Sequence, residues 1–168
     1  VWDLGFDGTG ITVGVMDTGV DGNHPALTNW AGNDSDYDGH PEWAFHDPVT
    51  GQTFPFDSGN HGTHCTGTVC GQGGIGVAPG ARYIHSAVID RVSIEQTITD
   101  AIAAFEWFVN PDGDPNTSWD APVVISNSWG LAPFFGYPEC SDLFWSAIDN
   151  CEAANIVVVF AAGNEGSS

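Results

Sequence analysis

Four runs of apolar, mostly β-branched residues are distributed along the chain. Runs that are apolar on both faces are typical of strands buried inside a parallel sheet. We expect these strands at Ile11–Met16, Tyr83–Ile89, Val123–Ser126 and Ile156–Ala161. Because long segments separate the runs, the sequence predicts a sheet assembled from distant parts of the chain.

Three of the intervening segments have helical spacing. Ser93-Ile-Glu-Gln96 is a capping box, and apolar positions continue at helical intervals until Asn110-Pro111 ends the pattern. A second helix is expected over about 142–154, with Asn155 as a left-handed cap. A third should begin near His61 and carry residues 63–69.

Strands alternating with helices predict an α/β fold, a three-layer sandwich with a mainly parallel, doubly wound sheet. Ligands of such sheets bind beyond the carboxyl ends of the strands. Asp17, Ser128 and Asn164 each follow a predicted strand, so this topology places them at one edge. Residues 29–57 show no clear periodicity and are predicted to form a long acidic loop insertion.

Composition narrows the possible partners. The chain has 168 residues, of which 42% are hydrophobic, and this suffices for one domain with a core. Two basic residues against 22 acidic ones give a net charge of −20. Nucleic-acid binding is excluded, because phosphate contacts need Lys and Arg. No membrane span is expected, since no apolar run approaches the ~20 residues that one requires.

Three short motifs carry candidate chemistry. Asp17-Thr-Gly19 ends an apolar run, His61-Gly-Thr-His64 lies at a Gly-rich junction, and Ala162-Gly-Asn164 follows the last apolar run. A buried carboxylate, an imidazole and a side-chain amide are the orienting acid, the base and the oxyanion donor of acyl transfer. A nucleophilic Ser in a Gly-Thr-Ser context is not among the 168 residues.

In this order, the motifs resemble those of the subtilisin-like serine proteases. His24-Pro25-Ala-Leu27, Gly76-Val-Ala-Pro79 and Asn29-Trp-Ala-Gly32 extend the resemblance and favour the bacillopeptidase F-like branch. The family's Ser follows later, in a Gly-Thr-Ser-Met type motif. The resemblance therefore implies that residues 1–168 are the amino-terminal part of a peptidase domain, inactive until its carboxy-terminal part is present. It also implies a secreted enzyme that acts on protein or peptide substrates and needs no cofactor for its chemistry.

The resemblance assigns roles to individual residues. Asp17 would orient the base His61, and Asn164 would bind the oxyanion. Two segments would form facing walls of the primary specificity pocket and hold the substrate backbone. The pocket residues are Ser128, Trp129, Gly130 and Leu131 on one wall, and Ala162, Gly163, Asn164 and Glu165 on the other. Because Glu165 would bring a carboxylate to the pocket, acidic substrate side chains are expected to bind poorly.

One acidic segment has the spacing of a calcium loop. Asp34, Asp36 and Asp38 precede Gly39 in an Asp-x-Asp-x-Asp-Gly pattern, so a structural calcium ion is one interpretation. Phe45 stands where such a loop carries its Glu, so a solvated acidic loop is the other interpretation. By resemblance, the short segment 71–76 lacks the excursion that builds the strong calcium site of the bacterial subtilisins.

The four cysteines do not form evident disulfide pairs. Cys65 and Cys70 fall in one predicted helix, and Cys140 and Cys151 flank another, which is poor geometry for a bridge. Free or buried thiols, or partners for cysteines elsewhere, are the remaining interpretations. The thiol-containing subtilases also carry a Cys directly after His-Gly-Thr-His, which implies that Cys65 lies near the base and confers sensitivity to mercurials.

The same residues are also compatible with three other functions. Asp17-Thr-Gly19 also occurs in aspartic proteases, but those folds are all-β and the predicted helices argue against them. His61 and His64 could form a metal pair on one helix, although no third ligand is evident. A non-catalytic pseudo-protease that binds peptides or metal is the general alternative to an enzyme.

Overall fold

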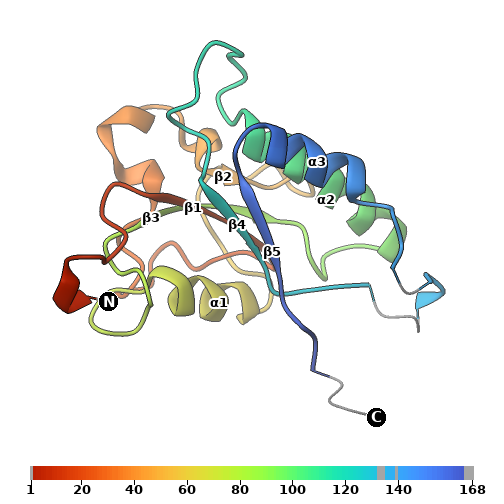
Figure 1. The fold of residues 1–168 in the computed structure, drawn as a ribbon, viewed down its shortest axis with the longest axis horizontal. Coiled ribbons are helices and arrows are strands. Elements are labelled where there is room, and N and C mark those ends of the chain that lie inside the picture. The colour runs from red at the N-terminus through yellow and green to blue at the C-terminus, as the bar shows by residue number, and fades with distance from the viewer. Residues whose placement is uncertain (1, 132–134, 139, 165–168) are drawn as a thin grey trace.

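The computed structural model describes residues 2–131, 135–138 and 140–164. Within them, five strands form a single sheet in the order β2-β3-β1-β4-β5, and every pairing is parallel (Figure 1). The strands are β1 (Thr12–Asp17), β2 (Phe45–His46), β3 (Arg82–Ala87), β4 (Val124–Asn127) and β5 (Val157–Phe160).

Helices cover both faces of this sheet. The α-helices of the described part are α1 (His61–Cys70), α2 (Ile94–Val109) and α3 (Trp145–Ala153). Short 3-10 helices lie at Trp2–Leu4, Ala31–Asn33, Ser35–Tyr37 and Pro41–Trp43. Helix α1 lies on one face of the sheet, and α2 and α3 lie side by side on the other (Figure 1). The predicted three-layer α/β sandwich with a parallel sheet is thus confirmed.

The four predicted strands are present, with ends that differ by one or two residues. The largest difference is in β3, which ends at Ala87 instead of the expected Ile89. The N–H groups of Val88 and Ile89 both donate to the carbonyl of Asp17, which pulls the chain across the end of β1. Strand β2 was not predicted, because two residues are too few to show a periodicity.

The three predicted helices are present, and the start of α3 is the one boundary that differs clearly from the prediction. The Ser93 side chain accepts from the Gln96 N–H, as a helix cap does, and α2 ends immediately before Asn110. Helix α3 begins at Trp145, three residues later than 142, and Asn155 has the expected left-handed φ of 63°.

Close packing of α2 on β1 forms the centre of the molecule. Gly14 lies in the middle of β1, where an added Cβ would come within 2.8 Å of the Phe108 ring. The side chains of Phe105, Phe108 and Ile125 are fully buried around this point. The absence of a side chain at Gly14 therefore sets the distance between the helix layer and the sheet.

The segment at 29–57 is a packed layer. Trp30, Tyr37 and Phe45 are each at most 4% exposed, and the Trp30 indole donates to the Ala44 carbonyl. A buried ion pair between Arg91 and Asp47 ties the same segment to the chain beyond β3. The segment shows no periodicity in the sequence because its elements are only two or three residues long, while Trp30, Tyr37 and Phe45 belong to the core.

Strand β5 lies at the end of the strand order and leaves apolar surface open. Val157, Val159 and Phe160 are 58%, 48% and 38% exposed.

None of the helices in the described ranges has the length and apolar character that crossing a membrane requires.

Candidate active site

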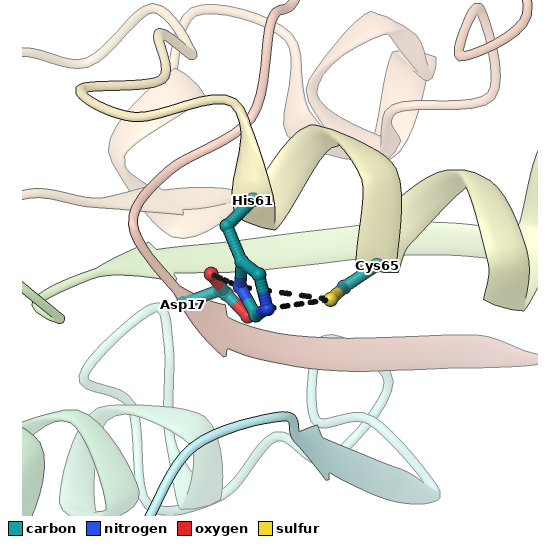
Figure 2. Close-up of side chains that lie close together, drawn as sticks. All are labelled: Asp17, His61 and Cys65. Atoms are coloured by element: carbon teal, nitrogen blue, oxygen red, sulfur yellow. Dashed lines mark hydrogen bonds and ion pairs between the residues drawn. The ribbon is translucent and has the colours of Figure 1, made fainter. Parts of the chain in front are cut away.

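Asp17 and His61 meet at the carboxyl end of β1. The Asp17 side chain is completely buried, and its Oδ1 lies 2.7 Å from His61 Nδ1 (Figure 2). The Thr18 N–H donates to the same oxygen at 2.7 Å. The carboxylate is held from the strand side and from the helix side, which fixes the orientation of the imidazole.

The start of α1 is clamped to the end of β1. The Gly62 N–H donates to Thr18 Oγ1 at 3.0 Å, and an added Cβ on Gly62 would lie 2.0 Å from the Gly19 carbonyl oxygen. This contact requires a residue without a side chain at position 62. Gly62 thereby allows the helix to approach closely enough for His61 to reach Asp17.

Asp57 connects the two elements and was missed by sequence reasoning. Its carboxylate accepts from Thr18 Oγ1 at 2.7 Å and from the Thr63 N–H and hydroxyl at 2.8 and 2.6 Å. Burial alone would raise the pKa of Asp57, but the hydrogen bonds from Thr63, Gly59 and Thr18 outweigh it and hold the pKa at about 2. No local motif marks this residue, because its partners are brought together only by the fold.

The charge on Asp17 favours protonation of His61. The hydrogen bond to Asp17 raises the pKa of His61 above 6.5, and partial burial opposes this rise. The imidazole side chain is 57% exposed, so one side of the ring remains open to solvent. A proton acceptor that is fixed on one side and open on the other has the geometry of a general base.

Cys65 lies one helical turn after His61 and faces the same ring (Figure 2). Its Sγ is 3.7 Å from Nδ1 and 3.8 Å from Nε2, so it is not aligned on one nitrogen as a nucleophile would be. Burial raises the pKa of the Cys65 thiol, which keeps it protonated. In the part of the chain described, all four cysteines are free, in agreement with one sequence interpretation.

The structure does not join the two histidines of the HxxH pattern into a metal site. Among the described residues, Asp17, His61 and Cys65 form the one group of three potential metal ligands whose atoms lie within 4.8 Å of one another. His64 instead lines a cavity of about 720 Å³ with Asp57 and Thr63, and His61 is not among the residues that line it.

The predicted substrate segment follows β4. Trp129, Gly130 and Leu131 line a cavity of about 160 Å³ together with Asp90 and apolar side chains. Those apolar residues include Ile89, Val92, Ile98, Phe135 and Phe144. The Ser128 side chain opposes the rise in the pKa of the Cys65 thiol that burial causes, so this segment lies next to α1.

The opposite wall of the predicted pocket is only partly described. Gly163 and Asn164 follow β5 and are exposed, and the chain runs away from the sheet there (Figure 1). Neither residue lines the cavity beside Trp129. Glu165 lies outside the described residues.

The structure does not gather Asp34, Asp36 and Asp38 as metal ligands. Arg82 Nη1 lies 3.1 Å from Asp34 Oδ2 and 3.4 Å from Asp36 Oδ2. The positive charge beside Asp34 and Asp36 is therefore the Arg82 guanidinium from β3. Among the described residues, this set is not a group of ligands within 4.8 Å of one another.

Comparison with known proteins agrees with the site and the fold. The chain is 38% identical over 174 residues to bacillopeptidase F of Bacillus subtilis, covering 97% of this chain and 12% of that protein. It is 31% identical over 170 residues to subtilisin E of Bacillus subtilis, covering 98% of this chain and 37% of that protein. A cold adapted subtilisin-like serine proteinase of known structure superimposes with a TM-score of 0.67 at 25% identity, over 95% of this chain and 48% of that one.

The chain thus spans less than half the length of each of the three proteins named above. The sequence profile of the Subtilase family matches residues 8–168, which is nearly the whole chain. This match includes Asp17, His61 and the segments on which the fold and the candidate site are built. The chain belongs to the subtilase family.

Proposed function

We propose that this chain supplies the general base and the orienting acid of a serine endopeptidase. The observation that carries the proposal is the 2.7 Å contact between His61 Nδ1 and the buried Asp17 Oδ1 on a subtilase fold. The nucleophilic Ser would come from a further segment of the same domain, since the 168 residues hold no Gly-Thr-Ser motif.

Each residue would have a defined task in peptide hydrolysis. His61 would take the proton of the Ser hydroxyl as that oxygen attacks the scissile carbonyl, and would then pass it to the leaving amine. Asp17 would hold the ring and stabilise the imidazolium that forms. The Asn164 amide would donate to the oxyanion, a contact typically worth ~3 kcal/mol in the transition state.

The substrate would be an extended peptide. Ser128, Trp129 and Gly130 would align its backbone, and the apolar cavity beside Trp129 and Leu131 would receive one of its side chains. Gly163 and Glu165 would complete the primary pocket, with Glu165 disfavouring Asp and Glu side chains. By its resemblance to the subtilisins, a secreted enzyme is part of the proposal.

The test compares the chain alone with the chain joined to a subtilase segment that carries Gly-Thr-Ser. We expect no peptide hydrolysis and no fluorophosphonate labelling from the 168 residues, and both from the joined protein. Peptide-library profiling of the joined protein and of its Glu165→Gln variant then tests the pocket. Equal acceptance of acidic residues by both would refute the role of Glu165, and a folded but inactive joined protein would favour the pseudo-protease alternative.

A further inference from the structure

The connection between α2 and β4 carries a second set of oxygen ligands. Its sequence is Asn-Pro-Asp-Gly-Asp-Pro-Asn-Thr-Ser-Trp-Asp over residues 110–120. Asp112, Asp114, Asn116 and Asp120 occupy positions 1, 3, 5 and 9 of the spacing used by calcium-binding loops. Spacing alone does not make a metal site, but the buried position of Asp120 distinguishes this segment from a solvated acidic loop.

Asp120 is a buried carboxylate with an unused oxygen. The residue is 0% exposed, and its Oδ2 accepts the Asp112 N–H at 2.8 Å. Its Oδ1 is also buried and has no hydrogen-bond partner. A buried oxygen without a partner is costly, so this site favours a cation that would bind it.

Among the described residues, both fixed positive charges are already paired with other carboxylates. Arg82 and Arg91 are the chain's only basic residues apart from histidines. Arg82 binds Asp34 and Asp36, and Arg91 binds Asp47. Across the described residues, no ion pair involves any of the acidic residues of the connection. A positive charge at Asp120 must therefore come from solution.

We propose that the 110–120 segment binds one calcium ion through the carboxylates of Asp112 and Asp120. The Thr117 hydroxyl contacts Asp112 Oδ2 at 2.7 Å and offers a neutral oxygen at the same place. The carboxylates of Asp112, Asp114 and Asp120 do not all lie within 4.8 Å of one another, so Asp114 is assigned an outer role through water. Calcium suits the segment because it accepts carboxylate, hydroxyl and water oxygens in flexible geometry.

The ion would fasten the end of α2 to the start of β4. Asn110 follows α2 directly, and the Tyr37 hydroxyl donates to the Asp120 carbonyl at 3.4 Å. A cation at Asp120 would thus stabilise the connection and the aromatic layer that packs on it. This role does not depend on the proposed peptidase function.

Terbium provides a direct probe, because Trp119 is adjacent to Asp120 and can sensitise terbium luminescence. In the whole chain, we expect saturable terbium emission that calcium displaces, with a calcium Kd of about 10⁻⁵–10⁻³ M and weaker displacement by magnesium. Trp119→Phe should remove most of the emission and leave the calcium-dependent rise in Tm.

Variants locate the ion. Asp120→Asn and Asp112→Asn should each weaken calcium binding by roughly tenfold or more. Asp38→Asn, an exposed change in the other acidic segment, is the matched control and should leave the affinity unchanged. Circular dichroism shows whether Asp120→Asn folds. If it does not, Asp112→Asn and the calcium titration of the wild type still test whether the 110–120 segment binds the ion. The proposal is overturned if the wild type shows no saturable calcium binding, or if Asp38→Asn removes it while Asp112→Asn does not.

Discussion

At the scale of single residues, the Asp17–His61 contact makes the titration of His61 measurable. Because the Asp17 carboxylate stabilises the imidazolium, we expect the pKa of His61 to lie above 6.5 in the folded chain. NMR titration of the His61 ring protons measures this value. Asp17→Asn should lower it toward 6.5, whereas Asp38→Asn should not change it. An unshifted pKa in the wild type would contradict the hydrogen bond in Figure 2.

The raised pKa of His61 makes the stability of the fold depend on pH. Since the folded-state pKa of His61 is raised, its contribution to stability is complete below the unfolded pKa and is lost as pH rises through the folded pKa. The base must be neutral to accept a proton, so activity of the complete enzyme should rise over the same pH range. A pH–rate profile that falls across this range would contradict the assignment of His61.

Cys65 allows a second residue-scale prediction. Its sulfur lies 3.7 Å from His61 Nδ1, so a mercurial bound there would displace or block the ring. We expect mercurials to inhibit the enzyme completed by its Ser segment, and Cys65→Ala to abolish this sensitivity. Cys140→Ala is the control, because Cys140 is exposed and belongs to no ligand group with His61. If Cys65→Ala and the wild type were equally sensitive to mercurials, inhibition would not occur through Cys65.

The candidate residues were predictable to different degrees. Asp17 and His61 lie in local motifs that could be read from the sequence, and the structure joins them. The partners of Asp57 and Asp34 could not be read, because Thr63 and Arg82 reach them only after α1 and β3 are in place. The roles proposed for Asn164 and Glu165 stay predictions.

At the scale of elements, two glycines of α1 form a matched pair. Gly62 contacts the Gly19 carbonyl, so Gly62→Ala should destabilise the fold by about 1–3 kcal/mol and displace His61. Gly67 has no atom near its added Cβ, so Gly67→Ala should stabilise the helix by about 0.5–1 kcal/mol. Chemical denaturation measures both. Similar effects of the two variants would refute the close approach of α1 to β1.

The predicted elements correspond to the segments with the clearest physical signals. Helix α2 has a cap, an apolar face and a Pro beyond its end, and its bounds were predicted almost completely. Strand β2 is only two residues long, and its pairing with β3 depends on the packing of Phe45 against distant residues. A strand of that kind carries no periodicity in the sequence, so only the folded chain reveals it.

At the scale of the whole molecule, the exposed face of β5 predicts marginal stability. Val157, Val159 and Phe160 leave apolar surface open at the end of the sheet. We expect the 168 residues to bind a hydrophobic dye strongly and to melt with low cooperativity. Joining the Ser-containing segment should reduce the dye signal. A monomer that melts sharply without binding dye would contradict this prediction.

In the proposed function, this chain holds the base and the orienting acid of a serine endopeptidase. The most direct measurement is peptide hydrolysis by the chain joined to its Ser-containing segment, compared with His61→Ala in the same protein. We expect kcat to fall by about a millionfold in His61→Ala, while fold and substrate affinity are kept. If His61→Ala folds and retains activity within about tenfold of the unaltered protein, His61 is not the base and the proposed mechanism is wrong.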